Sequence, residues 1–486
     1  MKITGFVEEK VKSSIINLEN LKPYIVLTFT INSDRPYLCF FFLVDPDGVI
    51  RVQFEGRKRE EKIFVGEEQG SIGTYPGKLK SGKWVLYFTN YGLIEDEREK
   101  KVPFSVEIET MDEIDHRDFT LIGEDRWIDY PPVKAGLRLN FNGNRKKSDE
   151  QRWYRGDFHV HTTLSDSHMT PKDAVEYCES NGIDFMFLTE HNLIHTGFEK
   201  SNTLFIPAIE VTLFRGHLLV YGLRDFIDCF TYEKFDSDYM NHSIKLVKEN
   251  GGLINVAHPM MVPWDWRFME TKLEDIDMME IVNCPNWHTS ESDNRKAIEL
   301  IDILWGEGFK ITGVGGSDNH LKPEEKCEGY TGPSLYADPS TYVFADGLSE
   351  GSIFEAVKNG RVYVSRGVKM DIDISSNRKN YLPGDEIEED SFTYKIDING
   401  NYESALKASL IMNGKVKEEK LLKDKISFEF SILWEKKDYN WARVGIYDEN
   451  NRFVAYINPV YRGRKKPNLL IWKELLKVYY HIYEKL

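Results

Sequence analysis

The sequence has few cysteines, and no two of them are close together in the chain. Only five occur in 486 residues, and no two stand in a CxxC pattern. Neither a disulfide framework nor a zinc site built from thiolates is therefore expected. The five are Cys39, Cys178, Cys229, Cys284 and Cys327.

Long apolar runs are also missing. No stretch approaches the roughly 18 apolar residues that a membrane-spanning helix needs. The first residues lack the apolar core of a secretory signal. We therefore expect a cytoplasmic protein with reduced cysteines and no membrane partner.

An excess of positive charge is absent as well. The chain has 63 Lys and Arg residues against 79 Asp and Glu residues, which gives a net charge of −16. A nucleic-acid partner is not expected for such a chain, because binding to the phosphate backbone needs basic surfaces. A phosphorylated small molecule is compatible with it, since a bound metal cluster can reverse the field inside one cleft.

The length predicts several domains, because 486 residues exceed what one hydrophobic core supports. Residues 1–150 alternate short apolar runs with turn signals such as Asp45-Pro46-Asp47-Gly48, which is typical of a β-sandwich. Residues 151–368 alternate strands and helices, which indicates a parallel sheet or a (β/α) barrel. Residues 369–466 return to a β pattern. The polar stretch 141–151 is predicted to be a linker.

Residues 467–486 are predicted to form a helix with one apolar face. Packing of this face on its own domain is one interpretation, and a homo-oligomer through the helix is the other. The residues on the face are Trp472, Leu475, Leu476, Tyr479, Ile482, Tyr483 and Leu486.

Histidines are concentrated in the middle third of the chain. Ten of the 12 lie between His159 and His320. His159 and His161 end a predicted strand, where side chains two residues apart point to the same side. Both imidazoles can therefore bind one metal ion.

Further polar side chains stand at or near the ends of the following strands. If these strands are parallel, their ends meet at one rim, where barrel enzymes build their active sites. Imidazole and carboxylate ligands without thiolate suit zinc, manganese or iron. We therefore predict two to three divalent transition metal ions (Zn, Mn or Fe). The further candidate ligands are His191, Glu210, His217, His258, Asp318 and His320.

The ordered motifs HxH, LSD, TEHN, IEVT with a following GH, AHP and GSDNH resemble the PHP (polymerase and histidinol phosphatase) domain. The resemblance covers roughly residues 153–370 and implies a distorted (β/α)7 barrel with a trinuclear metal site. It assigns His159, His161, Glu210 and Asp318 to one ion. Glu210 would bridge to a second ion, held also by His217 and His258. The third ion would be held by Asp166, His191 and His320.

The flanking segments extend the resemblance. Gly73-Thr74-Tyr75-Pro76-Gly77 and the Asp45–Gly48 turn are similar to the N-terminal β domain of the carbaryl-hydrolase-like branch of these metallohydrolases. The expected architecture is thus multidomain, with a distorted (β/α)7 barrel flanked by N-terminal and C-terminal β-sandwich domains. Two motifs depart from the family pattern. Ser167 stands where glycine is common, and Glu190 stands where aspartate is common, which predicts a changed orientation of His191.

The function that these residues favour is phosphoester hydrolysis by a metal-bridging hydroxide at a di- or trinuclear centre. Three ions suit a multiply charged phosphoryl group, and we expect Glu210, Asp318 and His258 to be catalytic. Arg215 and Lys322 are candidate substrate contacts, although a loop arginine on the surface explains Arg215 equally well. The alternatives are a carbamate or carboxylic-ester hydrolase on the same metals, and a non-catalytic binding protein with a degenerate barrel.

Other side chains near these motifs have two interpretations. The spare histidines His168, His195 and His288 are either ordinary loop residues or a general acid. Trp264, Trp266 and Trp287 follow strand ends, where they either pack in the core or line an aromatic pocket.

Overall fold

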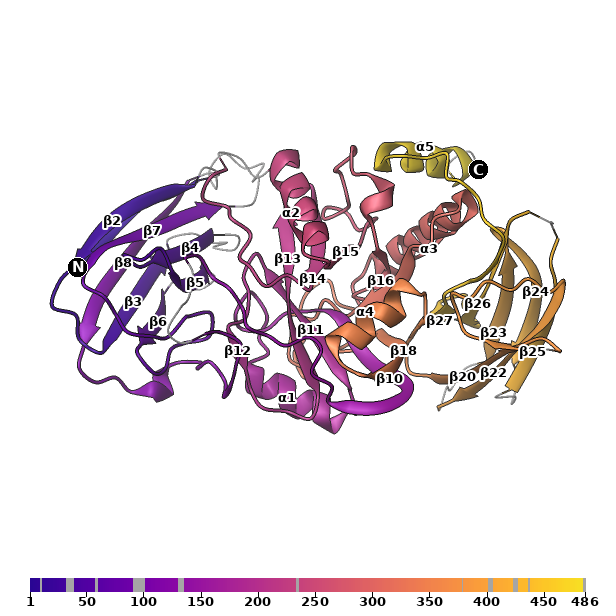
Figure 1. Cartoon of the computed structure of the whole chain (residues 1–486), viewed down its shortest axis with the longest axis horizontal. Coiled ribbons are helices and arrows are strands. Elements are labelled where there is room, and N and C mark those ends of the chain that lie inside the picture. The colour runs from indigo at the N-terminus through magenta and orange to yellow at the C-terminus, as the bar shows by residue number, and fades with distance from the viewer. Residues whose placement is uncertain are drawn as a thin grey trace. The chain divides into compact units, whose positions relative to one another are not determined.

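Figure 1 shows the computed structural model of the chain. The chain divides into two compact units, each assembled from several segments. The first unit comprises Met1–Asn142, His161–Ser180 and Phe187–Gly252. The second comprises Gly143–Val160, Asn181–Met186 and Leu253–Leu486. The described residues are 1–8, 11–31, 39–56, 60–90, 101–129, 135–232, 236–377, 379–400, 405–422, 427–435 and 438–483.

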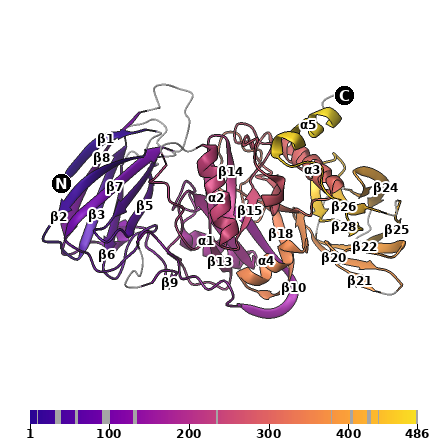
Figure 2. The same cartoon turned by 45° about the horizontal axis from the view of Figure 1, so that its top comes forward.

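The N-terminal part of the first unit contains two four-stranded antiparallel sheets, visible in Figure 2. Their strand orders are β1-β8-β3-β6 and β2-β7-β4-β5. Side chains of both sheets enter one hydrophobic core, so the sheets pack face to face. The strands are β1 (Lys2–Val7), β2 (Lys12–Leu18), β3 (Tyr24–Ile31), β4 (Cys39–Val44), β5 (Ile50–Gly56), β6 (Glu60–Gly66), β7 (Gly82–Asn90) and β8 (Val102–Met111).

The predicted turn between β4 and β5 is confirmed. The backbone N–H of Gly48 donates to the carbonyl oxygen of Asp45 over 2.9 Å, and Gly48 has a φ of 82°. The buried Arg51 then pairs with Asp45 over 3.2 Å and donates to the carbonyl oxygens of Tyr75 and Gly77. The Gly73–Gly77 motif is thereby tied to this turn.

The remainder of the first unit contains helix α1 (Pro171–Ser180). Thr170 caps it, because Oγ1 accepts from the Asp173 N–H over 3.1 Å and the Asp173 carboxylate accepts from the Thr170 N–H over 3.2 Å. The other elements are η1 (His116–Asp118), β9 (Asp125–Arg126), β12 (Gly197–Phe198), β13 (Leu204–Leu213), β14 (Gly216–Tyr221) and α2 (Ser237–Glu249). β11 (Phe185–His191) has its carboxyl end in this unit.

The second unit contains the strand–helix alternation predicted for the middle of the chain. β15 (Leu253–Val256), β16 (Met278–Asn283) and β17 (Thr312–Gly316) pair in parallel, with η2 (Leu273–Asp275) and α3 (Ser290–Glu307) between them. A parallel bridge between Val160 and Asn319 links β10 (Ser148–Val160) to the end of β17. Closure of these strands into a (β/α)7 barrel stays a prediction.

Part of the predicted linker is wrong. Ser148–Gln151 belong to β10, which pairs antiparallel with β18 (Ser340–Leu348). The polar start of β10 is largely exposed, so the sequence there lacks the apolar alternation of a half-buried strand. β19 (Val362–Ser365) follows on the other side of β18, after α4 (Glu350–Lys358).

The C-terminal region has the predicted β character. One sheet has the order β21-β20-β22-β25, and β27, β26, β23 and β24 continue from β19. Side chains of both sets share one core. The strands are β20 (Lys369–Ser375), β21 (Asn380–Tyr381), β22 (Ser391–Asn399), β23 (Leu406–Met412), β24 (Lys415–Leu422), β25 (Ser427–Leu433), β26 (Asn440–Asp448), β27 (Phe453–Ile457) and β28 (Val460–Arg462). The predicted domain boundaries are not tested by these contacts.

Helix α5 (Trp472–Tyr483) packs on its own unit. Tyr479 donates to Glu299 of α3 over 3.2 Å, and the ring of Trp472 lies 6.4 Å from that of Trp266. A homo-oligomer through this helix stays a prediction, and Leu486 lies outside the described residues. Among the described helices, none combines the length and apolar character that crossing a membrane requires.

Candidate metal centre

Five of the predicted ligands belong to the first unit, and Glu210 of β13 lies among them. Its Oε2 is 2.7 Å from Nδ1 of His191 and 3.4 Å from Nε2 of His161. Its Oε1 is 2.7 Å from Nδ1 of His217. His191 Nε2 in turn lies 3.3 Å from the Asp166 carboxylate. The contact of Glu210 with His217 follows from the hairpin of β13 and β14, which places these two residues close together.

The electrostatics of these ligands favour a cation. Burial opposes the charged form of His191, but the carboxylates of Asp166 and Glu210 raise its pKa well above the usual range. Glu210 is fully buried. Burying a carboxylate costs several kcal/mol unless positive charge compensates it, and a metal ion supplies such charge.

Four predicted ligands belong to the second unit and lie at or just after its strand ends. Nε2 of His159 lies 3.3 Å from the Asp318 carboxylate, and the Asp318 N–H donates to the His159 carbonyl oxygen over 2.8 Å. The imidazole of His258 stacks 5.9 Å from that of His159. His320 Nδ1 is 3.7 Å from Asp318 Oδ1. His258 and Asp318 have positive φ values of 26° and 49°, a strained conformation that is enriched at functional sites.

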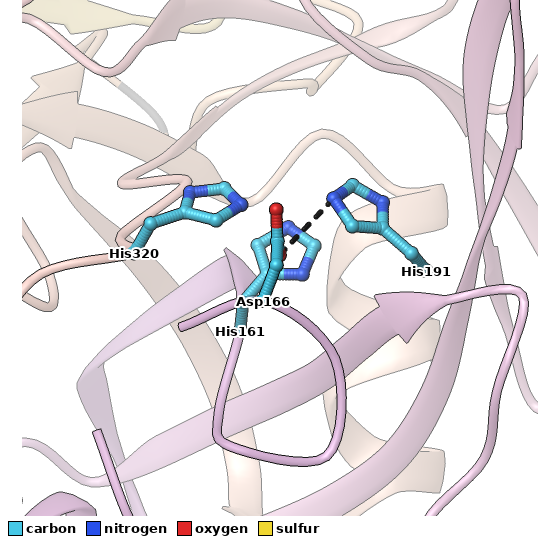
Figure 3. Close-up of side chains that lie close together, drawn as sticks. All are labelled: His161, Asp166, His191 and His320. Carbon is cyan, nitrogen blue, oxygen red and sulfur yellow. Dashed lines mark ion pairs between the residues drawn. The ribbon is translucent and has the colours of Figure 1, made fainter. Parts of the chain in front are cut away.

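Three groups of side chains in the described part of the chain can each hold a metal ion. Within each group, one ligand atom per residue lies within 4.8 Å of the others. Figure 3 shows the first, with three imidazoles around the Asp166 carboxylate. The groups are His161, Asp166, His191 and His320; His159, His161 and Glu210; and Glu210, His217 and His258. The three groups contain eight of the nine predicted ligands, with His161 and Glu210 each in two groups. The ninth, Asp318, lies beside His159.

A hydrogen bond to Nδ1 orients each of four ligand histidines. Such partners fix the tautomer so that Nε2 carries the lone pair that can bind a metal. The pairs are His159 with Glu280 (3.0 Å), His161 with Ser165 (3.2 Å), His191 with Thr212 (2.6 Å) and His320 with the backbone carbonyl oxygen of Asp318 (2.8 Å).

Glu280 was not predicted from the sequence. It is buried in β16, and its Oε1 accepts from His159 Nδ1 over 3.0 Å. Its Oε2 accepts from the His258 N–H over 2.8 Å and from Asn283 Nδ2 over 3.0 Å. One carboxylate thus holds two predicted ligands. A lone glutamate in the apolar run Met278–Val282 was the available signal.

Glu190 has a different role from the predicted one. It accepts hydrogen bonds from the N–H and hydroxyl groups of both Thr162 and Ser165, and it pairs with His195 Nε2 over 2.7 Å. Because the Ser165 hydroxyl donates to Glu190, its oxygen accepts from His161 Nδ1. Glu190 therefore supports His161 rather than His191, and the spare His195 belongs to this network.

We expect Glu190 to make the metal-free protein sensitive to acid. Burial alone raises the pKa of Glu190, but the hydrogen bond and charge of His195, with the charge of His161, lower it to about 2 from 4.5. The ionised carboxylate thus stabilises the fold above pH 4.5, by about 3 kcal/mol, and this contribution is lost as the pH falls toward 2. Urea unfolding of wild type and Glu190→Gln should show a difference in free energy that shrinks below about pH 4.5. A difference independent of pH would contradict the assignment.

The two predicted substrate contacts lie near ligands in the sequence. Arg215 occupies the turn between β13 and β14, with Nη1 3.5 Å from the Ser237 hydroxyl. Lys322 follows His320, and its backbone N–H donates to Glu325 over 2.8 Å. Their roles as substrate contacts stay predictions.

Comparisons with known proteins give low similarity. The chain matches no family model and no curated protein. Among solved structures it is similar to a two-domain protein from Bacteroides vulgatus containing a predicted PHP-like metal-dependent phosphoesterase. Their identity is 18%, the match covers 67% of this chain and 100% of the other, and the TM-score is 0.35. An engineered protein matches at 8% identity over 39% of this chain and 49% of its own, with a TM-score of 0.15. Similarity at these TM-scores establishes neither fold nor function.

Proposed function

We propose that the protein is a metal-dependent hydrolase and that it acts on phosphoesters. The observation that carries the proposal is the set of three ligand groups joined by shared residues, with Glu210 in two of them. Nitrogen and carboxylate oxygen donors suit zinc, manganese or iron. The hydrogen-bonded Nδ1 atoms support the same conclusion, because they present Nε2 as the ligand atom.

The contacts of these residues indicate a role for each of them. When bound, the ions would lower the pKa of coordinated water and neutralise charge on the reacting group. Glu210 would hold two groups at a fixed separation, since its two oxygens face different histidines. Glu280 would keep the Nδ1 proton of His159 in place, so that Nε2 stays available. Asp318 and His258 would contribute to catalysis by holding ions in place, each from a strained backbone conformation.

Phosphoesters are favoured over other substrates for a reason of charge. A phosphoryl group carries more negative charge than a carbamate or carboxylic ester, and several adjacent cations stabilise it better. Arg215 and Lys322 would add to this charge if they reach the substrate.

The test combines metal content with a substrate panel. Elemental analysis of protein from metal-replete medium should give two to three transition ions per chain, all removable by chelators. Loaded with manganese or zinc, the protein should hydrolyse nitrophenyl phosphate or bis-nitrophenyl phosphate with a higher kcat/KM than naphthyl carbamate. Less than one ion per chain would contradict the metal centre.

The alternatives have their own outcomes. A kcat/KM for the carbamate that exceeds both phosphate values by about 100-fold, roughly 2.7 kcal/mol in the barrier, would replace the phosphoesterase with a carbamate or ester hydrolase. Full metal content with no hydrolysis of the panel would favour a non-catalytic binding protein.

A further inference from the structure

Aromatic side chains follow all three parallel strands of the second unit. Trp264 lies in the loop after β15, Trp287 in the loop after β16, and Tyr330 in the loop after β17. The carboxyl ends of parallel strands meet at one edge of a sheet, where ligands bind in α/β proteins. His258 and Asp318 leave the same edge. We call Trp264, Trp287 and Tyr330 the aromatic wall.

The three rings contact one another in sequence. The centroids of Trp264 and Trp287 are 6.1 Å apart with an interplanar angle of 62°, and those of Trp287 and Tyr330 are 5.3 Å apart at 77°. Both are edge-to-face contacts, the arrangement that aromatic pairs prefer. A backbone bridge also joins Trp287 to Tyr330. The wall is therefore one packed cluster of rings rather than three separate side chains.

The loops hold the wall next to predicted metal ligands. The loop with Trp264 starts at His258, whose carbonyl oxygen accepts from the Met261 N–H over 3.0 Å. The Cys284 N–H donates to Gly316 at the end of β17 over 3.2 Å, and the Cys284 thiol lies 3.9 Å from the Tyr330 hydroxyl. Burial raises the pKa of Tyr330, and the charge of Asp318 adds to the effect.

One end of the wall is exposed. Trp264 is 39% exposed and Val262 before it is 66% exposed, whereas Trp266 is 1% exposed and packs against Phe268. Single exposed apolar residues are common on protein surfaces. An exposed tryptophan that continues a row of rings toward predicted metal ligands is different, because the row offers a ready surface for a flat apolar group. The packing interpretation therefore holds for Trp266 and not for Trp264.

We infer that the aromatic wall binds a ring-bearing leaving group, so that the substrate is an aryl phosphoester. The inference rests on the proposed function. In the reaction, water adds to phosphorus and the bond from phosphorus to the aryl oxygen breaks. The phosphate keeps the hydroxyl of the water, and the ring leaves as a phenol that takes the remaining proton. The wall would contact the ring before and after this step, which predicts affinity for the phenol as well.

The first test compares two substrates in metal-loaded protein. Trp264→Ala should lower kcat/KM for naphthyl phosphate about 10-fold, through a higher KM, and should leave glycerol phosphate unchanged, since glycerol has no ring to stack. Trp264→Phe should recover most of the loss because it restores an aromatic face. The control is Tyr480→Ala, which removes a ring of similar exposure, 43%, from α5.

The second test measures binding without hydrolysis. Equilibrium dialysis of naphthol should give a dissociation constant about 10-fold higher for Trp264→Ala than for wild type, with Tyr480→Ala unchanged. If neither phosphate is hydrolysed but naphthol binding depends on Trp264, the phosphoesterase is wrong and the wall stands as a ring-binding surface. Naphthol binding that is unchanged in both Trp264→Ala and Trp287→Ala would overturn the inference.

Discussion

Replacing Glu210 with glutamine should remove metal and activity together. Glutamine keeps the shape of the side chain but has one oxygen and no charge, so it cannot serve both His191 and His217 as Glu210 does. Two of the three ligand groups lose their shared carboxylate. Metal catalysis contributes several kcal/mol to transition-state stabilisation, and each 1.36 kcal/mol is tenfold in rate. We expect kcat/KM to fall by at least about 1,000-fold, with metal content measured on the same preparation.

A matched control separates this effect from general damage to the fold. Glu350 of α4 is 5% exposed and belongs to none of the three groups, so Glu350→Gln should keep its metal and its activity. Thermal unfolding should show that both variants are folded. Wild-type metal content and full activity in Glu210→Gln would disprove the shared-ligand role.

Replacing Glu280 with glutamine should weaken metal binding without removing any ligand. Glu280 accepts three hydrogen bonds, from donors of His159, His258 and Asn283. In a glutamine, the NH2 donor would face one of these three donors. That buried donor would then lack an acceptor, at a cost of about 1–3 kcal/mol. Loss of a hydrogen-bonding partner of a metal ligand typically costs about 10- to 100-fold in metal affinity or activity. We expect a fall in this range.

The measurement must separate positioning from stability. Metal dissociation constants from competition with a chelator report the positioning, and urea unfolding of the metal-free protein reports the stability. Glu299→Gln is a suitable control, because it alters a half-buried carboxylate that accepts from Tyr479 and lies outside the ligand groups. If Glu280→Gln lowers the stability but keeps the metal affinity of wild type, Glu280 has only a structural role.

Local signals predicted the elements that local interactions build. The capping box of Thr170 and Asp173 spans three residues, so it is visible in the sequence at the start of α1. The start of β10 could not be found this way. Its polar residues pair with β18 nearly 200 residues later, as in the register of Gln151 with Asp346, and such pairing leaves no local pattern.

The candidate ligands were visible in the sequence for a different reason. Histidine and carboxylate residues at successive strand ends form an ordered series. This series can be recognised in the sequence without knowledge of the packing. Glu280 has no such series, since its bond to His159 joins residues 121 positions apart. Trp264 and Trp266 show the same limit, because two tryptophans in one loop differ in exposure only through tertiary contacts.

The shared membership of His161 and Glu210 would couple metal binding at the three ligand groups. Each residue belongs to two groups, so the groups form a chain in which neighbouring ions would compete for, or jointly order, the same side chain. Occupancy of one group would then change the affinity of the next by a factor that is reciprocal between them. A metal titration of this protein should depart from the curve of three independent sites, and a chelator that empties one group alters the affinity of its neighbour.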